Sequence, residues 1–339
     1  MKLNREQIQA VTFGAEEIIC ESDGFHFNRF SAAQRDLYVC TSPDDFYRKT
    51  FATSGIRLQF STDSRKLKLD ISVSSASSRS YFALDVFVNG AMIGSIDNLT
   101  DDMPLDYTLA QLPLGDYFGE FDLGDGMKDV CLFLPWSVCA VIRSMELDDG
   151  SVIAPIKPCH KLLAFGDSIT QGYDAKHPSN KYITRLALAL DAEECNKAIG
   201  GEEFYPPMVE AENGTAPDYI AVAYGTNDWS HSTRQRLTER CRGFYKTISD
   251  KYPKAKIFAL TPIWRLDWEM EKPVGPFHDV EEIIREAVKD LPNVAVIRGF
   301  DHVPKDTSFF ADLRLHPNDA GFDHYYHNLW KEVSKVLGK

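Results

Sequence analysis

The sequence has few basic residues relative to its acidic residues. It carries 37 lysines and arginines against 50 aspartates and glutamates, which gives a formal net charge of −13 at pH 7. Nucleic acids and anionic membranes are polyanions, so this excess of acid argues against broad binding to either. No apolar run approaches the ~20 residues of a membrane span, and the stretch Met1–Gln7 lacks the long apolar segment of a signal peptide. We therefore expect a cytoplasmic protein that binds neither nucleic acid nor a membrane.

Cysteine is also scarce and irregularly placed. The chain has 7 cysteines and no C-x-x-C pair, which argues against a disulfide framework or a zinc knuckle. The sequence contains no H-E-x-x-H, no P-loop and no G-x-G-x-x-G motif, so zinc peptidase, nucleoside triphosphatase and dinucleotide-binding interpretations have no support. We expect a protein that uses no cofactor.

The first half of the chain has an apolar pattern of period two. Leu67, Leu69, Ile71 and Val73 alternate with polar residues, as in a half-buried strand. The pair Asn89-Gly90 separates two apolar runs and predicts a tight hairpin, because both turn positions need a positive φ. Further short strands are expected at 36–40, 55–61, 117–122, 128–134 and 138–147. Many short strands with little helix predict an all-β sandwich over residues 1–155, with a jelly-roll-like topology.

The second half alternates between strands and helices. A length of 339 residues favours two domains, since one domain usually holds roughly 100–200 residues. Strands alternating with amphipathic helices predict an α/β domain with a parallel sheet over residues 156–339. The stretch Ser151–Pro158 is the expected linker. The predicted strands are Lys161–Phe165, Tyr219–Ala223, Ile257–Leu260 and Val294–Ile297.

A Gly-Asp-Ser block follows the first strand of this α/β domain. Ligands bind at the carboxyl ends of the strands in open α/β sheets, and Ser168 stands there beside an expected helix N-terminus. Free N–H groups at that position favour negative charge, which suits a nucleophile whose attack creates an oxyanion. Taken by itself, Ser168 is better explained as the N-cap of the helix.

Three further blocks lie at strand ends or in loops that lead to a helix. They are Asn196–Gly201, Gly225–Asp228 and His316-Pro317. A serine nucleophile needs a base, and an oxyanion needs donors placed where its charge develops. Glycine allows the backbone to approach closely, and an asparagine amide donates without adding charge. These residue types are those that acyl transfer requires.

The four blocks together resemble the SGNH (GDSL-type) hydrolases over roughly residues 160–339. The resemblance implies a three-layer α/β/α fold with a five-stranded parallel sheet. It implies Ser168 as the nucleophile and His316 as the general base. The oxyanion hole would be formed by the backbone N–H groups of Ser168 and Gly201 and by the Asn227 side chain. The G-x-S-x-G elbow of the other large esterase class is absent, because Thr170 occupies its second glycine position.

The expected aspartate of a catalytic triad departs from this family pattern. The family places it three residues before the histidine, where this chain has Leu313, whereas Asp312 lies four residues before His316. A one-residue adjustment of the loop would bring Asp312 to His316 Nδ1–H. Alternatively, a backbone carbonyl orients the ring, and the site is a Ser–His dyad.

A β-sandwich ahead of an SGNH domain resembles the architecture of carbohydrate acetylesterases. Aromatic residues close to the catalytic blocks are candidates for stacking on a sugar ring, and we select Trp264, Arg265, Trp229 and Tyr224 as substrate-binding residues. Many such aromatics are ordinary core residues, which is the alternative for these as well.

The C-terminal region gathers acids and histidines in a way that superficially resembles a metal site. We expect no metal there, because two of the histidines fall on an amphipathic helix where solvated histidines are common. The cluster consists of His316, Asp319, Asp323, His324 and His327.

These features predict a carboxylic ester hydrolase that removes short acyl groups, above all acetyl, from a sugar. The expected partner is a small acylated substrate, in particular an acetylated oligosaccharide. An acyltransferase would share every catalytic residue and differ only in its acceptor. A non-catalytic carbohydrate-binding protein is a third reading, against which the intact Ser168, Gly201, Asn227 and His316 argue.

Overall fold

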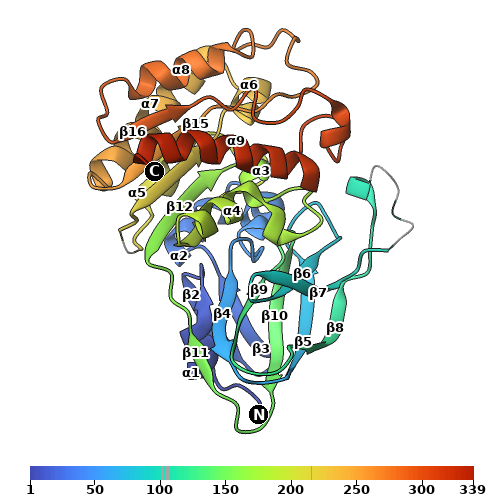
Figure 1. Cartoon of the computed structure of the whole chain (residues 1–339). Helices are drawn as coiled ribbons and strands as arrows, with labels where there is room; N and C mark the ends of the chain where they lie inside the picture. The colour runs from blue at the N-terminus through green and yellow to red at the C-terminus, as the bar shows by residue number, and fades with distance from the viewer. Residues whose placement is uncertain (101–102, 104–106, 215) are drawn as a thin grey trace.

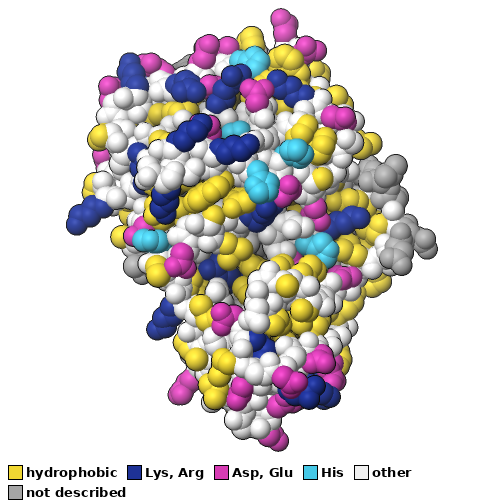
Figure 2. All heavy atoms as spheres, viewed as in Figure 1, with side chains coloured by type: hydrophobic (Ala, Val, Ile, Leu, Met, Phe, Trp, Pro, Cys, Tyr) yellow, Lys and Arg dark blue, Asp and Glu magenta, His cyan; other side chains and the backbone are white. Residues whose placement is uncertain are grey.

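The computed structural model describes residues 1–100, 103, 107–214 and 216–339. Figure 1 shows two parts: a β-rich part that contains the N-terminus, and an α/β part that ends with the C-terminus. No helix of the described chain is long and apolar enough to cross a membrane. Basic and acidic side chains are interspersed over the face in Figure 2.

The N-terminal part consists of two antiparallel sheets, as the period-two pattern predicts. One sheet has the order β1 (Thr12–Phe13), β4 (Arg57–Thr62), β9 (Lys128–Phe133), β6 (Ala83–Val88) and β7 (Ala91–Asp97), with β11 (Ile153–Pro155) paired to β4. The other has the order β2 (Glu17–Glu21), β3 (Gly24–Asn28), β10 (Val138–Leu147), β5 (Lys66–Ser75) and β8 (Gly115–Asp122). The all-β domain is thereby confirmed, while its jelly-roll topology stays a prediction.

The expected hairpin joins β6 to β7. Asn89 and Gly90 have φ values of 50° and 81°, so both occupy the left-handed region that this turn requires. The strands pair antiparallel on either side of the turn, from Val88 opposite Ala91 to Ala83 opposite Asp97.

Two expectations for this part were wrong. The segment 36–40 is not a strand but lies largely in α2 (Ala32–Val39), because Ser31 and Gln34 form a capping box that starts a helix just upstream. The expected linker Ser151–Pro158 contains strand β11, whose pairing with β4 fixes this stretch to the sandwich. The remaining helical elements of the N-terminal part are α1 (Arg5–Val11), η1 (Pro43–Tyr47) and η2 (Tyr107–Leu109).

The C-terminal part is a parallel sheet between two helical layers. The strand order is β13 (Ala192–Asn196), β12 (His160–Gly166), β14 (Tyr219–Ala223), β15 (Lys256–Leu260) and β16 (Val294–Ile297). The helices are α3 (Ser168–Gln171), α4 (Tyr182–Ala189), α5 (Pro206–Glu210), α6 (Thr226–His231), α7 (Arg234–Lys251), α8 (Asp279–Val288) and α9 (Asp319–Leu337), with short turns η3 (Pro178–Asn180) and η4 (Thr307–Phe309). Helices α4 and α9 pack together on one face, and α5, α7 and α8 on the other (Figure 1). The predicted three-layer fold is confirmed.

Large aromatic side chains join the two parts. Trp136 is 1% exposed and donates from Nε1 to the carbonyl oxygen of Ala175 at 2.8 Å. The aromatics of the N-terminal part that belong to the hydrophobic core of the α/β part are Phe30, Tyr38, Tyr81, Tyr107 and Trp136. Because these rings are buried against the second domain, the sandwich is held firmly beside the carboxyl edge of the parallel sheet.

Candidate active site

Ser168 lies at the carboxyl end of β12, at the first position of the four-residue helix α3. The N-cap of that helix is Asp167, whose side chain accepts from the Ile169 N–H at 3.0 Å. The capping role considered for Ser168 is thus filled by its neighbour, and the serine hydroxyl is free for other contacts. Gly166 permits the tight turn, since a Cβ there would lie 2.4 Å from Thr170 Oγ1.

His316 contacts Ser168 across the sheet edge. Its Nε2 lies 2.8 Å from Ser168 Oγ, and its Nδ1 lies 2.8 Å from Asp312 Oδ2. Leu313 has a φ of 55°, so the extra residue between acid and base is taken up by one left-handed position. The loop is also held by the other carboxylate oxygen of Asp312, which accepts the N–H groups of Arg314, Leu315 and His316. The structure thus brings Ser168, His316 and Asp312 together in the order of a triad.

A second carboxylate, which the sequence did not point to, also contacts His316. Asp174 Oδ2 lies 3.2 Å from His316 Nδ1, and the Asp174 side chain is fully buried. Its carboxylate binds the Arg79 guanidinium through two hydrogen bonds of 2.7 and 3.1 Å and accepts the Tyr81 hydroxyl. The only sequence signal is an acid six positions after the serine, which is too common to single out.

These contacts set the charge state of the histidine. Burial alone would lower the pKa of His316, but the hydrogen bonds to Asp174 and Asp312 outweigh it and raise that pKa to about 9. Burial would likewise raise the pKa of Asp174, but its bonds with His316 and Arg79 hold it well below the usual value. Both carboxylates therefore stay ionised and favour a proton on the imidazole.

The candidate oxyanion donors are the Gly201 backbone and the Asn227 side chain. Gly201 has a φ of 92°, a conformation that favours glycine. The Asn227 side chain donates to the carbonyl oxygen of Glu202 at 3.0 Å, which fixes the amide while leaving its second N–H available. The N-terminal part supports this turn, because Lys49 Nζ donates to the Gly200 carbonyl at 2.7 Å.

A family model matches the segment that carries these contacts: residues 164–324 fit the GDSL-like lipase/acylhydrolase family. The match covers 161 of the 339 residues and shows that this segment is similar to that family. A search of curated proteins finds no significant match.

Three solved structures resemble 85% or more of the chain, in both of its parts. A salicylyl-acyltransferase from a tetracycline biosynthetic pathway is 18% identical, with a TM-score of 0.79 over 96% of this chain and 94% of that one. A protein described as a GDSL-like lipase, from Bacteroides ovatus ATCC 8483, is 18% identical, with a TM-score of 0.77 over 100% and 98%. A family two carbohydrate esterase from Clostridium thermocellum, in complex with cellohexaose, is 16% identical, with a TM-score of 0.62 over 85% and 94%. At these identities the likeness shows the fold.

A cavity of about 340 Å³ adjoins Gly201 between the sandwich and the GDSL-like domain. Burial raises the pKa of Glu202, one of its lining residues, to about 8. The lining combines rings, hydroxyls and charged groups from both parts: Tyr38, Thr41, Ser42, Phe46, Gly201, Glu202, Glu203, Tyr205, Arg236 and Arg240. Sequence reasoning missed this cavity because four of its ten lining residues come from the α2–η1 segment of the N-terminal part, far from the catalytic blocks in the sequence.

The four residues selected for substrate stacking lie in the core of the GDSL-like domain instead. Trp229 and Tyr224 are 0% and 1% exposed, and Trp264 and Arg265 are 6% and 2% exposed. The polar groups of Trp229 and Tyr224 already have hydrogen-bond partners. The Tyr224 hydroxyl donates to the Glu202 carboxylate at 2.7 Å, and the Trp229 indole N–H donates to the Gly275 carbonyl at 2.9 Å. Arg265 binds the Thr226 carbonyl and hydroxyl. The expected sugar-stacking role of these residues is therefore replaced by a packing role.

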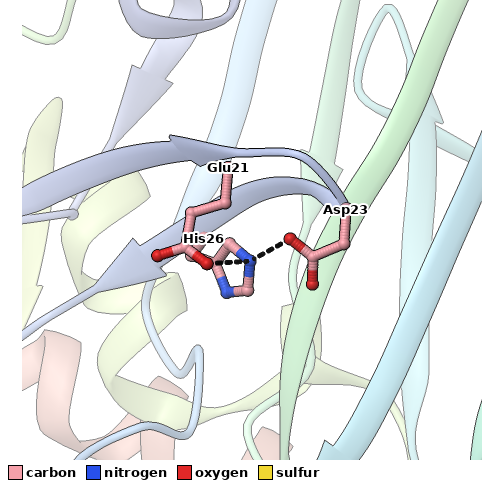
Figure 3. Close-up of side chains that lie close together, drawn as sticks. All are labelled: Glu21, Asp23 and His26. Carbon is pink, nitrogen blue, oxygen red and sulfur yellow. Dashed lines mark hydrogen bonds and ion pairs between the residues drawn. The ribbon is translucent and has the colours of Figure 1, made fainter.

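Two clusters among the described residues have the composition of a metal site. One consists of Asp174, Asp312 and His316, but Arg79 already neutralises one of its carboxylates. The other, Glu21, Asp23 and His26, lies on the exposed hairpin of β2 and β3 (Figure 3), where His26 Nε2 is 2.9 Å from Asp23 Oδ1.

Of the histidines that raised the metal question in the sequence, only His316 belongs to one of these clusters. His324 and His327 are exposed on α9. Asp323 pairs with Arg185 rather than with His316, and Asp319 accepts the Lys176 N–H at 3.0 Å.

Proposed function

We propose that this protein is a serine esterase that removes short acyl groups, above all acetyl, from carbohydrate substrates. In the first half-reaction, Ser168 Oγ attacks the ester carbonyl carbon while His316 Nε2 takes the serine proton. The tetrahedral oxyanion accepts the backbone N–H groups of Ser168 and Gly201 and the Asn227 amide. As the intermediate collapses, the bond to the alcohol oxygen breaks, and that oxygen receives the proton from His316 and leaves.

Water completes the reaction. It attacks the acyl-enzyme while His316 takes its proton, and the second tetrahedral intermediate releases the carboxylic acid as Ser168 regains its proton. The observation that carries this proposal is the 2.8 Å contact between Ser168 Oγ and His316 Nε2, with the opposite nitrogen held by a carboxylate. That arrangement fixes the tautomer that a general base requires.

The cavity beside Gly201 supports a ring-shaped alcohol as the leaving group. Tyr38, Phe46 and Tyr205 offer aromatic surface there, while Arg236 and Arg240 add hydrogen-bond donors. Sugars are recognised by this combination of an apolar ring face and polar groups. The carbohydrate esterase fold of one structural neighbour agrees with that substrate class.

An acyltransferase is the second candidate, because one neighbour of this fold is a salicylyl-acyltransferase. It would use the same acyl-enzyme and replace water by an alcohol acceptor. Transfer products formed in the presence of a sugar or an aromatic alcohol, in excess over free acid, would favour this function.

The test is hydrolysis of p-nitrophenyl acetate, followed by acetylated xylo- and manno-oligosaccharides. We expect Ser168→Ala to lower kcat by roughly 10³–10⁶-fold, since the covalent route is lost. Ser249→Ala is a matched control, because Ser249 is also buried but its hydroxyl contacts Asn293 on the far side of the domain. Unchanged turnover by purified Ser168→Ala would contradict the proposal.

A further inference from the structure

The β-sandwich part reaches the catalytic histidine through one buried carboxylate. Asp174 lies in the loop after α3, yet the donors to its carboxylate oxygens other than His316 are Arg79 and Tyr81, from the segment between β5 and β6. Asp174 has a φ of 71°, unusual for a residue with a side chain. The Asp174 carbonyl oxygen accepts a hydrogen bond from the Tyr107 hydroxyl. The N-terminal part therefore holds both the side chain and the backbone of Asp174.

We infer that Asp174 is a second carboxylate partner of His316 Nδ1, and that through it Arg79 and Tyr81 of the β-sandwich part position the general base. The inference rests on the proposed function for the role of His316, but the contact itself does not depend on activity. By this inference, residues of the N-terminal part help to orient the general base of the second domain.

The geometry explains why two carboxylates at one nitrogen are useful. The single Nδ1–H lies within 2.8 Å of Asp312 and 3.2 Å of Asp174, so either acid alone holds the ring and its tautomer. The Asp312 side chain is partly exposed, whereas Asp174 is fully buried and bound by a guanidinium. Asp174 therefore holds the orientation of the His316 ring more rigidly than Asp312 does. Each of the two acids partly replaces the other in this role.

The charges around the imidazole agree with this arrangement. Asp174 and Asp312 face Nδ1, Arg79 stands behind Asp174, and Asp167 at the cap of α3 also acts on the ring. When His316 accepts the serine proton, the imidazolium forms between two carboxylates, of which only one has a guanidinium partner. Both acids therefore stabilise the charge that develops during the reaction.

The first experiment is an NMR titration of His316 in a Ser168→Ala background, with His316→Gln used to assign the signal. We expect Asp174→Asn to lower the pKa of His316 by about one unit or more, since one of two partners of the imidazolium is lost. An unchanged pKa in the folded Asp174→Asn protein would overturn the inference. This readout decides the contact even if the wild-type protein hydrolyses no ester, so the two proposals can fail separately.

The second experiment is a double-mutant cycle on the active enzyme, measured by steady-state kinetics. We expect Asp174→Asn and Asp312→Asn to lower kcat by roughly 10–100-fold each, with KM nearly unchanged, and the double variant to lose about 10⁴-fold, as in enzymes that lack any orienting carboxylate. If Asp312→Asn alone loses as much as the double variant, or if Asp174→Asn keeps wild-type kcat, the second carboxylate has no positioning role.

A third pair of variants keeps the inference testable if Asp174→Asn does not fold. Tyr81→Phe removes a donor to the Asp174 carboxylate, which leaves more negative charge facing His316 and raises the pKa of the histidine. Tyr107→Phe is the matched comparison, because that buried hydroxyl donates to the Asp174 carbonyl oxygen rather than to the carboxylate, and the two rings pack edge to face at 5.1 Å. Equal titration curves for Tyr81→Phe and wild type would contradict the inference.

Discussion

Replacing Asn227 by alanine tests the proposed oxyanion site. Asn227 is the second residue of α6 and is 8% exposed. One amide hydrogen binds the carbonyl oxygen of Glu202 at 3.0 Å, and in the proposed mechanism the other binds the oxyanion. Gly225 precedes the helix with a φ of 117°, which lets the chain turn so that the amide lies at the sheet edge. Alanine removes both hydrogen bonds and leaves the turn intact.

The two lost bonds predict two separate effects. Removing one oxyanion donor costs about 10²–10³-fold in kcat, or ~2.7–4 kcal/mol. KM should change little, because the bond is made only as charge develops in the transition state. The orphaned Glu202 carbonyl is buried, so the free energy of unfolding should fall by about 1–3 kcal/mol.

Steady-state kinetics with p-nitrophenyl acetate and urea unfolding measure these effects side by side. Asn293→Ala is the matched control, because Asn293 donates to the carbonyl oxygens of Tyr252 and Ala255 at 3.2 and 3.4 Å, away from the serine. The control should lose stability and keep kcat. A folded Asn227→Ala protein whose kcat stays within about tenfold of wild type would refute the donor role.

Three further outcomes are expected. Since only neutral His316 accepts a proton, and since its hydrogen bonds to Asp174 and Asp312 overcome burial and raise its pKa to about 9, kcat/KM should rise with pH through the region above neutrality; a midpoint at or below ~6.5, the unperturbed value, would count against paired carboxylates. EDTA should leave turnover unchanged, because the proposed steps use only serine, histidine and the oxyanion donors; a loss that added zinc restores would revive the metal interpretation of the Asp174, Asp312 and His316 cluster. Among p-nitrophenyl esters kcat/KM should follow acetate > butyrate ≫ octanoate, because a long acyl chain needs an apolar channel in which each buried CH₂ contributes ~0.8 kcal/mol, whereas the cavity beside Gly201 is lined by charged and hydroxyl groups as well as rings; a preference for octanoate would contradict the short-acyl proposal.

Local pattern was enough to predict the parallel sheet, and the resemblance of the four ordered blocks to a known family was enough to select Ser168 and His316. Strand and helix periods are properties of neighbouring residues, and in a parallel sheet every strand delivers its carboxyl end to the same edge. Blocks that follow those strands must therefore lie near one another. The Asn89-Gly90 hairpin was also predictable, because the two positive φ values that the turn requires depend only on the residues at these two positions.

Tertiary packing decided the rest. Which aromatic residues face a cavity depends on what covers them, so Trp229 and Trp264 became core while Tyr38 and Phe46 came to line the cavity beside Gly201. Arg79 lies 95 positions before Asp174, and no short-range pattern links the two. Their contact exists because buried aromatic side chains hold the sandwich against the second domain, and only that docking brings a guanidinium and a second carboxylate to the histidine.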